Sequence, residues 1–278
     1  MGHDKLRKFA ENETFTCLLQ PSAEELLVDG YFNLRDHSIK GNWRKEMFPE
    51  SDPDSGLVLE LGCGKGEYTV DLAMRNSASN YVGVDIKGAR LWKGAKYVTE
   101  NEIRNAAFLR TRVEFITAFF ASGEVSEIWL TFSDPQFRSE NSRLSSPLFL
   151  ERYRKMLGKG GIVHLKTDSR FLHEYTLAVC KANGLQILAC TKDLYAEERG
   201  AAIGDEVFEV QTFYEKLFLD QGYKITYLSF VIDKDGDYRS PSEEEFDSEY
   251  WRSVEGPRLL FGHDSAETRR QKLKNKAD

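Results

Sequence analysis

The stretch that decides the fold runs from Leu57 to Gly66 and reads LVLELGCGKG. In it a short apolar run precedes three alternating glycines, and a helix-like segment follows from Tyr68 to Ala73. Glycine tolerates the positive φ that a tight turn requires, and it has no Cβ to hold a ligand away from the backbone. Strand, glycine-rich turn and helix in this order predict a site where the backbone approaches a nucleoside-containing ligand.

The acidic residues around this turn indicate which ligand it holds. A second apolar run, from Tyr81 to Val84, ends at Asp85, and an acidic residue at this place is the usual partner of ribose hydroxyls. The carboxylate of Glu60 would repel a pyrophosphate but suits the ammonium group of S-adenosylmethionine. The alternating glycines also depart from the G-x-G-x-x-G spacing of dinucleotide sites. We therefore expect S-adenosylmethionine as the cofactor; a strand-to-helix turn without any ligand is the alternative.

Apolar runs alternate with helical patterns from residue 57 to about residue 232. This alternation predicts an α/β fold with a doubly wound, mostly parallel sheet, in which we expect the last strand pair to be antiparallel. The predicted strands are 57–61, 81–85, 107–112, 126–132, 161–166, 185–190 and 224–232. The predicted helices are 66–75, 87–104, 147–157, 170–183 and 212–221.

The segments on either side of this pattern are expected to be less regular. Residues 1–55 lack strong periodicity and end in a loose stretch from Pro49 to Ser55, so we interpret them as an N-terminal arm and linker. Residues 56–232 are expected to form the cofactor-binding domain. Residues 233–278 are interpreted as a polar tail, acidic first and basic from Arg269 to Lys276, that is mobile or loosely docked.

Composition excludes several classes of protein. No run approaches the ~20 apolar residues that cross a bilayer, and the first ten residues are polar and basic, unlike a signal peptide. The four cysteines, Cys17, Cys63, Cys180 and Cys190, are scattered without metal-ligand spacing and suit a reducing cytoplasm. We expect a cytoplasmic protein that is not bound to a membrane, and the sequence leaves both a monomer and a homodimer open.

The net charge of −7 at first argues against a nucleic-acid partner. However, the segment from Asp233 to Glu255 holds nine acidic and three basic residues, and therefore nearly all of the net negative charge. The remainder has local basic groups around residues 5–8, 40–45, 87–96, 138–143 and 152–155. A polyanion responds to such local groups, although each one alone is better explained as a solvated helix face.

The acidic segment also imitates a calcium site. Acidic residues between Asp233 and Glu244 match positions 1, 3, 5 and 12 of an EF-hand loop. The position that needs glycine is Tyr238, and Pro241 interrupts the segment. We therefore interpret it as a polar turn and expect no bound metal.

Three acidic residues are candidates for the reaction site. Asp134 follows the predicted strand 126–132, Asp168 follows the strand 161–166, and Glu215 lies in the segment Thr212-Phe213-Tyr214-Glu215 that opens a predicted helix. The carboxyl ends of parallel strands meet beside the cofactor in such folds, and carboxylates can accept hydrogen bonds from the N–H groups of guanine. Asp134 is the candidate catalytic residue. The alternatives are helix N-caps at Asp168 or Thr212 and a capping box completed by Glu215.

The order and spacing of these motifs resemble the bacterial tRNA (guanine-N7)-methyltransferases, which modify a guanine in the variable loop of tRNA. The resemblance spans roughly residues 35–232. The matching pieces are Leu59–Tyr68, Gly83–Lys87 with Arg90, Asn105 with Phe108–Arg110, Phe132–Pro135, Leu144 with Pro147, Phe149-Leu150 and Tyr153, Gly160-Gly161, Lys166–Asp168 and Thr212–Glu215.

The resemblance implies a Rossmann-like methyltransferase sheet and methyl transfer from S-adenosylmethionine to N7 of a guanine in tRNA. It implies cofactor contacts from Glu60, Gly62, Gly64, Gly66, Asp85, Ile86, Arg112 and Asp134. It also implies that Asp134 is catalytic. The implied substrate contacts are Arg138, which stands where the family has a lysine, Asp168, Thr212, Phe213, Tyr214 and Glu215.

The sequence departs from the family pattern in three places. The motif Phe-Pro-Asp-Pro-Trp reads FSDPQ at residues 132–136, and Arg112 stands where the family has Asp or Asn. The following loop, residues 138–143, has few basic side chains, although phosphate contacts supply much of the affinity for RNA. We therefore expect tRNA binding to be weak or to use other basic groups.

A mechanism and two alternatives follow from these residues. N7 of guanine carries an available lone pair, so we expect direct attack on the sulfonium methyl group, with catalysis by positioning and electrostatics. Asp134 would stabilise the transferred charge or orient the ring. The alternatives are a methyltransferase acting on another RNA or a small molecule, and a non-catalytic relative that binds RNA or cofactor. The thin basic loop favours the first of these.

Overall fold

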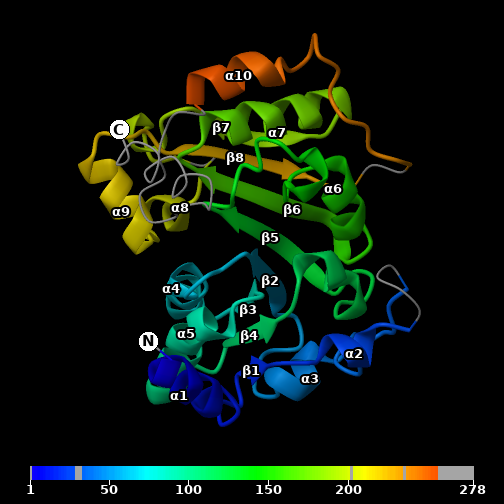
Figure 1. Ribbon diagram of the computed structural model, residues 1–278, viewed down its shortest axis with the longest axis vertical. Helices are drawn as coiled ribbons and strands as arrows, with labels where there is room; N and C mark the ends of the chain where they lie inside the picture. Colours follow the sequence, from blue (N-terminus) through cyan, green and yellow to red (C-terminus); the bar gives the residue numbers. More distant parts are fainter. Residues whose placement is uncertain (1, 29–32, 201–202, 234–235, 256–278) are drawn as a thin grey trace, which may run out of the picture.

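The computed structural model describes residues 2–28, 33–200, 203–233 and 236–255, which form a twisted sheet covered by helices on both faces (Figure 1). The eight strands lie in the order β1-β4-β3-β2-β5-β6-β8-β7. All neighbours are parallel except β8, which runs antiparallel to both β6 and β7. The strands are β1 (Leu18–Leu19), β2 (Gly56–Leu61), β3 (Ser79–Asp85), β4 (Ala106–Arg110), β5 (Val125–Thr131), β6 (Leu157–Thr167), β7 (Ile187–Thr191) and β8 (Thr226–Val231).

Two apolar layers hold the helices to the sheet, because successive side chains of a strand point to opposite faces. On one face Leu59, Ile128 and Val163 pack under η1 (Val113–Ala118), α6 (Pro147–Arg154) and α7 (Arg170–Ala182). On the other face Val58 and Trp129 pack under α4 (Glu67–Arg75), α5 (Gly88–Glu100), α8 (Asp205–Glu209) and α9 (Phe213–Asp220). The remaining helices are α1 (Gly2–Asn12), α2 (Ala23–Leu26), α3 (Trp43–Met47), η2 (Glu140–Ser142), η3 (Leu194–Ala196) and α10 (Ser248–Glu255).

The predicted fold class is confirmed: the sheet is doubly wound and mostly parallel, and its last strand pair, β7 and β8, is antiparallel. Every predicted strand and helix is present, with ends displaced by a few residues. The largest difference at a strand is in β6, which begins at Leu157 and not at residue 161. The amide of Val125 donates to the carbonyl of Met156, and Leu157 pairs with Val125. These contacts draw the chain into the sheet directly after α6.

The N-terminal segment differs from the interpretation of residues 1–55 as an arm and linker. Strand β1 pairs in parallel with β4, and Asn12 at the end of α1 donates a hydrogen bond to the carbonyl of Gly88 at 2.9 Å. Trp43 is fully buried, where its indole stacks on Phe120 with the ring centroids 5.0 Å apart. Its Nε1 donates to the carbonyl of Phe119 at 2.8 Å. The segment therefore supplies both a sheet edge and core side chains.

The described part of the C-terminal segment also packs more closely than a loosely docked tail. Figure 1 shows α10 lying over α7, and Phe246 packs edge-on against Phe171 and Tyr175 with centroids 5.3 and 5.5 Å apart. The carboxylate of Glu255 accepts a hydrogen bond from the amide of Phe171 at 2.5 Å. The basic run from residue 269 to 276 and residues 234–235 of the EF-hand-like segment lie outside the described residues.

Replacing Trp43 by Ala is expected to lower the free energy of unfolding by about 3–5 kcal/mol, because it removes a fully buried indole and leaves a cavity. Trp43→Phe keeps a ring against Phe120 but loses the hydrogen bond to Phe119, so the expected loss is roughly 1–2 kcal/mol. Urea unfolding of the three proteins measures both values. A loss below about 1 kcal/mol for Trp43→Ala would show that the N-terminal segment is peripheral to the folded core.

Candidate active site

The turn after β2 is built from glycines in the left-handed region. Gly62, Gly64 and Gly66 have φ values of 79°, 59° and 72°, which side-chain-bearing residues rarely adopt. Gly66 is also required for packing, since an added Cβ would lie 2.4 Å from the ring of Phe108. An added Cβ at Gly64 would meet no atom within 4 Å, so this part of the turn is open to a ligand. The turn is therefore tightly packed at Gly66, where α4 begins, and accessible at Gly64.

Glu60 lies behind this turn and is bonded to the protein on both carboxylate oxygens. One oxygen accepts hydrogen bonds from the amide, at 2.9 Å, and the hydroxyl of Thr69; the other accepts from the hydroxyl of Thr131 at 2.5 Å. Burial raises the pKa of Glu60 to about 7, although the bonds from Thr131 and Thr69 oppose this shift. Glu60 thus joins β2 to α4 and β5, a role that the sequence analysis did not anticipate.

Asp85 ties the turn after β3 to the turn after β2. Its carboxylate accepts hydrogen bonds from the amide of Gly64 at 3.0 Å and from the amide of Lys87 at 2.7 Å. The neighbouring Ile86 is about half exposed, at 49%, beside this carboxylate. The structure therefore brings Asp85, Ile86 and the glycine turn together, as the sequence predicted, with an apolar side chain facing solvent next to an acidic one.

Asp134 stands in a strained loop directly after β5. It is exposed, and its carboxylate accepts a hydrogen bond from the amide of Gln136 at 2.9 Å. Phe132 and Gln136 have φ values of 50° and 48°, which cost energy in residues other than glycine. The ring of Phe132 packs near that of Phe218 in α9, with centroids 6.4 Å apart. The backbone of this loop therefore adopts an unfavourable conformation, and its residue Phe132 faces α9.

Arg143 holds the loop that carries Asp134 and is buried, so it is not a surface charge. It is only 3% exposed and donates to the carbonyls of Pro135, at 3.1 Å, and Phe137, at 3.4 Å. Its guanidinium stacks on the rings of Tyr175 and Phe171, at 4.4 and 4.8 Å from their centroids. This position corrects the grouping of Arg143 with the local basic residues that a polyanion would meet.

Glu215 is buried in an ion pair with Lys166, and both side chains are fully inaccessible. The Lys166 ammonium lies 2.7 Å from Glu215 Oε1 and donates to the carbonyls of Val207 and Val210 at 2.7 and 2.9 Å. Burial lowers the pKa of Lys166, and the charge of Glu215 opposes that shift. The hydroxyl of Tyr195 donates to the same Glu215 oxygen at 2.5 Å. Within the described residues Glu215 Oε2 is buried and has no hydrogen-bond partner.

The structure shows which of the residues considered as helix N-caps have that role. Thr212 is the N-cap of α9, because its hydroxyl accepts a hydrogen bond from the amide of Glu215 at 3.1 Å. The capping box is not completed, since the Glu215 side chain turns inward to Lys166. The N-cap of α7 is Ser169 and not Asp168, which is half-buried at the end of β6.

The first turn of α9 lies against the glycine turn. Phe213 and Tyr214 are 60% and 40% exposed, and the ammonium of Lys65 lies 5.9 Å from the centroid of each ring. Segments more than 140 residues apart in the chain therefore meet at one edge of the sheet. The remaining predicted contacts are less defined: Arg112 is exposed at the start of η1 and 3.9 Å from Glu114, and Arg138 is exposed beyond the Asp134 loop.

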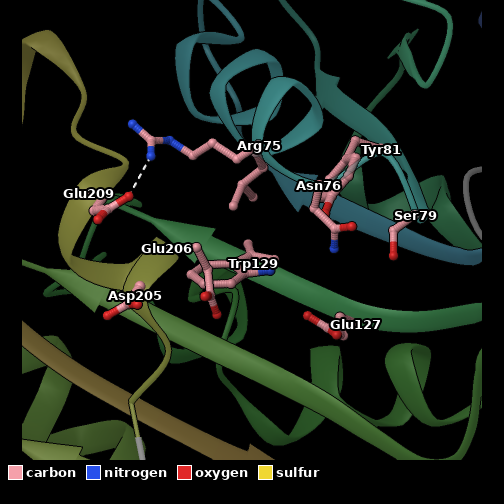
Figure 2. A pocket seen from close by; sticks show the side chains of 10 residues that line it. Arg75, Asn76, Ser79, Tyr81, Glu127, Trp129, Asp205, Glu206 and Glu209 are labelled. Atoms are coloured by element: carbon pink, nitrogen blue, oxygen red, sulfur yellow. Dashed lines mark hydrogen bonds and ion pairs between the residues drawn. The ribbon is translucent and has the colours of Figure 1, made fainter. Parts of the chain in front are cut away.

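A separate cavity of about 430 Å³ lies on the sheet face between the end of α4 and α8 (Figure 2). Figure 2 shows the bond from Arg75 at the end of α4 to Glu209 in α8, together with the side chains of Glu206 and Trp129. The cavity is lined by Leu72, Arg75, Asn76, Ser79, Tyr81, Glu127, Trp129, Asp205, Glu206 and Glu209. None of the predicted site residues lines it, so it is distinct from the glycine turn.

Sequence reasoning missed two side chains that shape the site: Lys166 and Tyr195. Lys166 was visible in its motif, but only the pairing of β6 with β8 and the position of α9 reveal that it is buried against Glu215. No local pattern singles out Tyr195. Among the described residues no group of three or more His, Cys, Asp or Glu side chains could hold a metal ion. The described helices are all too short or too polar to cross a membrane.

Comparison with known proteins identifies the family. A family model described as "Putative methyltransferase" matches residues 54–228. The chain is 48% identical over 231 residues to the tRNA (guanine-N(7)-)-methyltransferase of Christiangramia forsetii, covering 82% of this chain and 98% of that protein. This chain belongs to the tRNA (guanine-N(7)-)-methyltransferase family. The enzyme of the same name from Bacteroides fragilis is 45% identical over 249 residues, covering 89% of this chain and 94% of that protein.

The comparison with solved structures agrees on the fold. The crystal structure of the 16S rRNA methyltransferase KamB superposes with a TM-score of 0.52 at 16% identity, covering 68% of this chain and 92% of that chain. The predicted family and the predicted Rossmann-like methyltransferase fold are therefore both confirmed. The predicted cofactor, S-adenosylmethionine, is that of the methyltransferase family to which the chain belongs. The open centre of the turn at Gly64 and the exposed Ile86 beside Asp85 suit its nucleoside.

The pKa of Glu60 predicts a pH dependence of stability. Between the ordinary value near 4.5 and about pH 7, the folded protein holds a proton that the unfolded chain has released. The free energy of unfolding therefore falls as the pH rises through this window, and the contribution levels off above it. Glu60→Gln should flatten this part of the profile, because it removes the titrating group.

Urea unfolding at pH 5, 6, 7 and 8 measures the profiles of both proteins. Glu46→Gln, which changes an exposed glutamate in α3, is the matched control and should leave the profile unchanged. Parallel profiles for the wild type and Glu60→Gln would contradict the assignment.

Proposed function

We propose that this protein transfers the methyl group of S-adenosylmethionine to N7 of a guanine in the variable loop of tRNA. The single observation that carries the proposal is the contact between the glycine turn and the first turn of α9, made by Lys65 with Phe213 and Tyr214. That contact brings the cofactor segment and the predicted substrate segment to one edge of the sheet. Kinship with enzymes of this name over 98% and 94% of their lengths supports the proposal.

In this proposal the cofactor is held by the turn and by the ends of β3 and β5. Gly62, Gly64 and Gly66 shape the backbone, and Ile86 offers an apolar surface to the adenine. Asp85 binds the ribose hydroxyls through lone pairs that the amides of Gly64 and Lys87 leave free. Glu60 acts on the cofactor through its charge behind the turn, since its oxygens already accept from Thr69 and Thr131. Asp134 and Arg112 complete the set, the latter through its backbone.

The target guanine is proposed to lie between Asp134 and the first turn of α9. Asp168 and Glu215 accept hydrogen bonds from its N–H edge, and Phe213 and Tyr214 offer exposed rings on which bases stack. Glu215 Oε2 is a buried acceptor without a partner in the described residues, which fits a ligand that brings N–H donors. Because this oxygen is inaccessible, the side chains that cover it must move aside when guanine enters. Thr212 anchors the first turn of α9, and Arg138 contacts the RNA backbone.

The chemistry requires little from the protein beyond position and charge. The cofactor supplies a methyl group on a positively charged sulfur. N7 of guanine has a free lone pair, so no side chain needs to remove a proton before attack. As the methyl group moves, positive charge moves from sulfur to the purine ring. The exposed carboxylate of Asp134 stabilises this charge on the ring and orients it.

Further parts of the proposal concern the setting of the reaction. We place the protein in the cytoplasm with tRNA as its partner, working without a metal ion. Both a monomer and a homodimer remain part of the proposal.

A second candidate function is methylation of another RNA or of a small molecule. The observation that favours it is the burial of Arg143, which leaves Arg138 as the exposed basic side chain of the loop 138–143. Phosphate contacts supply much of the affinity for RNA, so a loop with little exposed positive charge weakens this part of a tRNA interface. Basic groups on other elements, such as Lys65, would have to compensate.

The test is transfer of labelled methyl groups from S-adenosylmethionine to unmodified tRNA, with the labelled nucleoside identified after digestion. The expected product is 7-methylguanosine. Label in a different nucleoside, or transfer only to another class of acceptor, would favour the second candidate. Cofactor binding without any methylated product would contradict both.

Asp134→Ala is expected to reduce turnover at least about a hundredfold while leaving the thermal midpoint nearly unchanged, since the side chain is exposed. Asp54→Ala is the matched control, because Asp54 is an exposed loop residue at the opposite end of β2. Single-turnover methyl transfer, with cofactor affinity measured separately, checks the role. Turnover within a few-fold of the wild type would exclude Asp134 as the catalytic residue.

A further inference from the structure

Glu67 connects the segment proposed to hold the cofactor with the segment proposed to hold the guanine. It is the first residue of α4, directly after Gly66 of the glycine turn. Its Oε2 accepts a hydrogen bond at 3.1 Å from the amide of Phe213, the first residue of α9. The two residues are 146 positions apart in the chain. Glu67 is therefore a direct bridge between the two proposed binding segments.

Glu67 provides a hydrogen-bond acceptor for a backbone amide at the start of α9 that has no acceptor within the helix. The first amides of a helix have no partner within the helix. Thr212 caps the amide of Glu215, and Glu67 takes the amide of Phe213. A carboxylate is well suited to this place, because it lies at the positively polarised N-termini of both α4 and α9. The same helix start is held on its inner side by the buried pair of Glu215 with Lys166.

A third element fixes the bridging side chain. Glu67 Oε1 lies 2.7 Å from the ammonium of Lys93 in α5, so both oxygens have partners. Burial alone would raise the pKa of Glu67, but the bonds from Lys93 and the Phe213 amide, together with the charge of Lys65, lower it. Glu67 is therefore ionised at neutral pH, and its side chain is 27% exposed, so water competes with the bridge only in part.

We propose that Glu67 is a positioning residue that couples cofactor binding at the glycine turn to tRNA binding at α9. A ligand that orders the turn also fixes the position of Glu67, and with it the amide of Phe213 and the aromatic pair that follows. Binding of either ligand then orders residues that the other ligand also needs in order. Each ligand therefore lowers the entropic cost of binding the other, which is positive coupling between two sites. This inference rests on the proposed function for the identity of the second ligand.

The experiment measures the affinity of the full chain for S-adenosylhomocysteine by calorimetry, with and without saturating unmodified tRNA. S-adenosylhomocysteine carries no methyl group to transfer, so the binding result does not depend on turnover. In the wild type tRNA should raise the affinity at least about fivefold, within the usual range for coupled sites. In Glu67→Ala the ratio should fall to near one. Glu67→Gln keeps an oxygen for the Phe213 amide but loses the ion pair with Lys93, so its ratio should be intermediate.

The matched control is Asp71→Ala in the same helix. Asp71 pairs with Arg75 one turn along, and it should leave the ratio at the wild-type value. Equal ratios for Glu67→Ala and Asp71→Ala would overturn the inference, as would a ratio of one in the wild type. If Glu67→Ala does not fold, equal ratios for Glu67→Gln and Asp71→Ala overturn it. A wild type that binds tRNA with coupling but transfers no methyl group supports the inference while contradicting the proposed reaction.

Discussion

The buried carboxylate of Glu60 is the constraint on which the site depends. It bonds β2 to the start of α4 and to the end of β5 at once, through Thr69 and Thr131. A buried carboxylate without such partners would be strongly destabilising, so the chain between Glu60 and Thr69 has little freedom. It must reverse within a few residues, and it does so through glycines in the left-handed region. The open backbone at Gly64 lies within this turn, between Glu60 and its partner Thr69. Burial also raises the pKa of this group to about 7, and a cationic ligand nearby would lower that pKa again and favour the carboxylate.

A second buried charge fixes the other half of the site. Lys166 at the end of β6 donates to Glu215 and to the two carbonyls that precede α9, so the start of that helix is bound to the sheet. Arg143 does the same for the loop that carries Asp134, because it is held between aromatic rings of α7 and donates to loop carbonyls. Phe246 packs on those same rings. The C-terminal segment thus supports the reaction loop indirectly, through α7.

The sequence predicts the structural elements that follow from a periodic pattern of apolar residues. It does not predict the side-chain contacts between residues that are distant in the chain. The period of the apolar runs from residue 57 to 232 was enough for the doubly wound sheet, and the order of motifs was enough for the family. The contribution of residues 1–55 was missed because β1 has two residues and Trp43 is an isolated aromatic whose partners, Phe119 and Phe120, directly follow η1. The sequence placed Arg143 in a local basic group and Glu215 among the guanine contacts, without indicating that either side chain is buried. Only the rings of α7 and the ammonium of Lys166, both distant in sequence, show that these charges are buried.

The most direct test of where the reaction takes place is a crystal structure with S-adenosylhomocysteine and 7-methylguanosine 5′-monophosphate bound together. We expect S-adenosylhomocysteine against the turn from Gly62 to Gly66, with its ribose at Asp85. The methylated ring should lie between Asp134 and the first turn of α9, with Glu215 Oε2 now bonded to its N–H edge. Binding of the purine in the acidic cavity of Figure 2, or away from both Asp134 and α9, would contradict the assignment of the site.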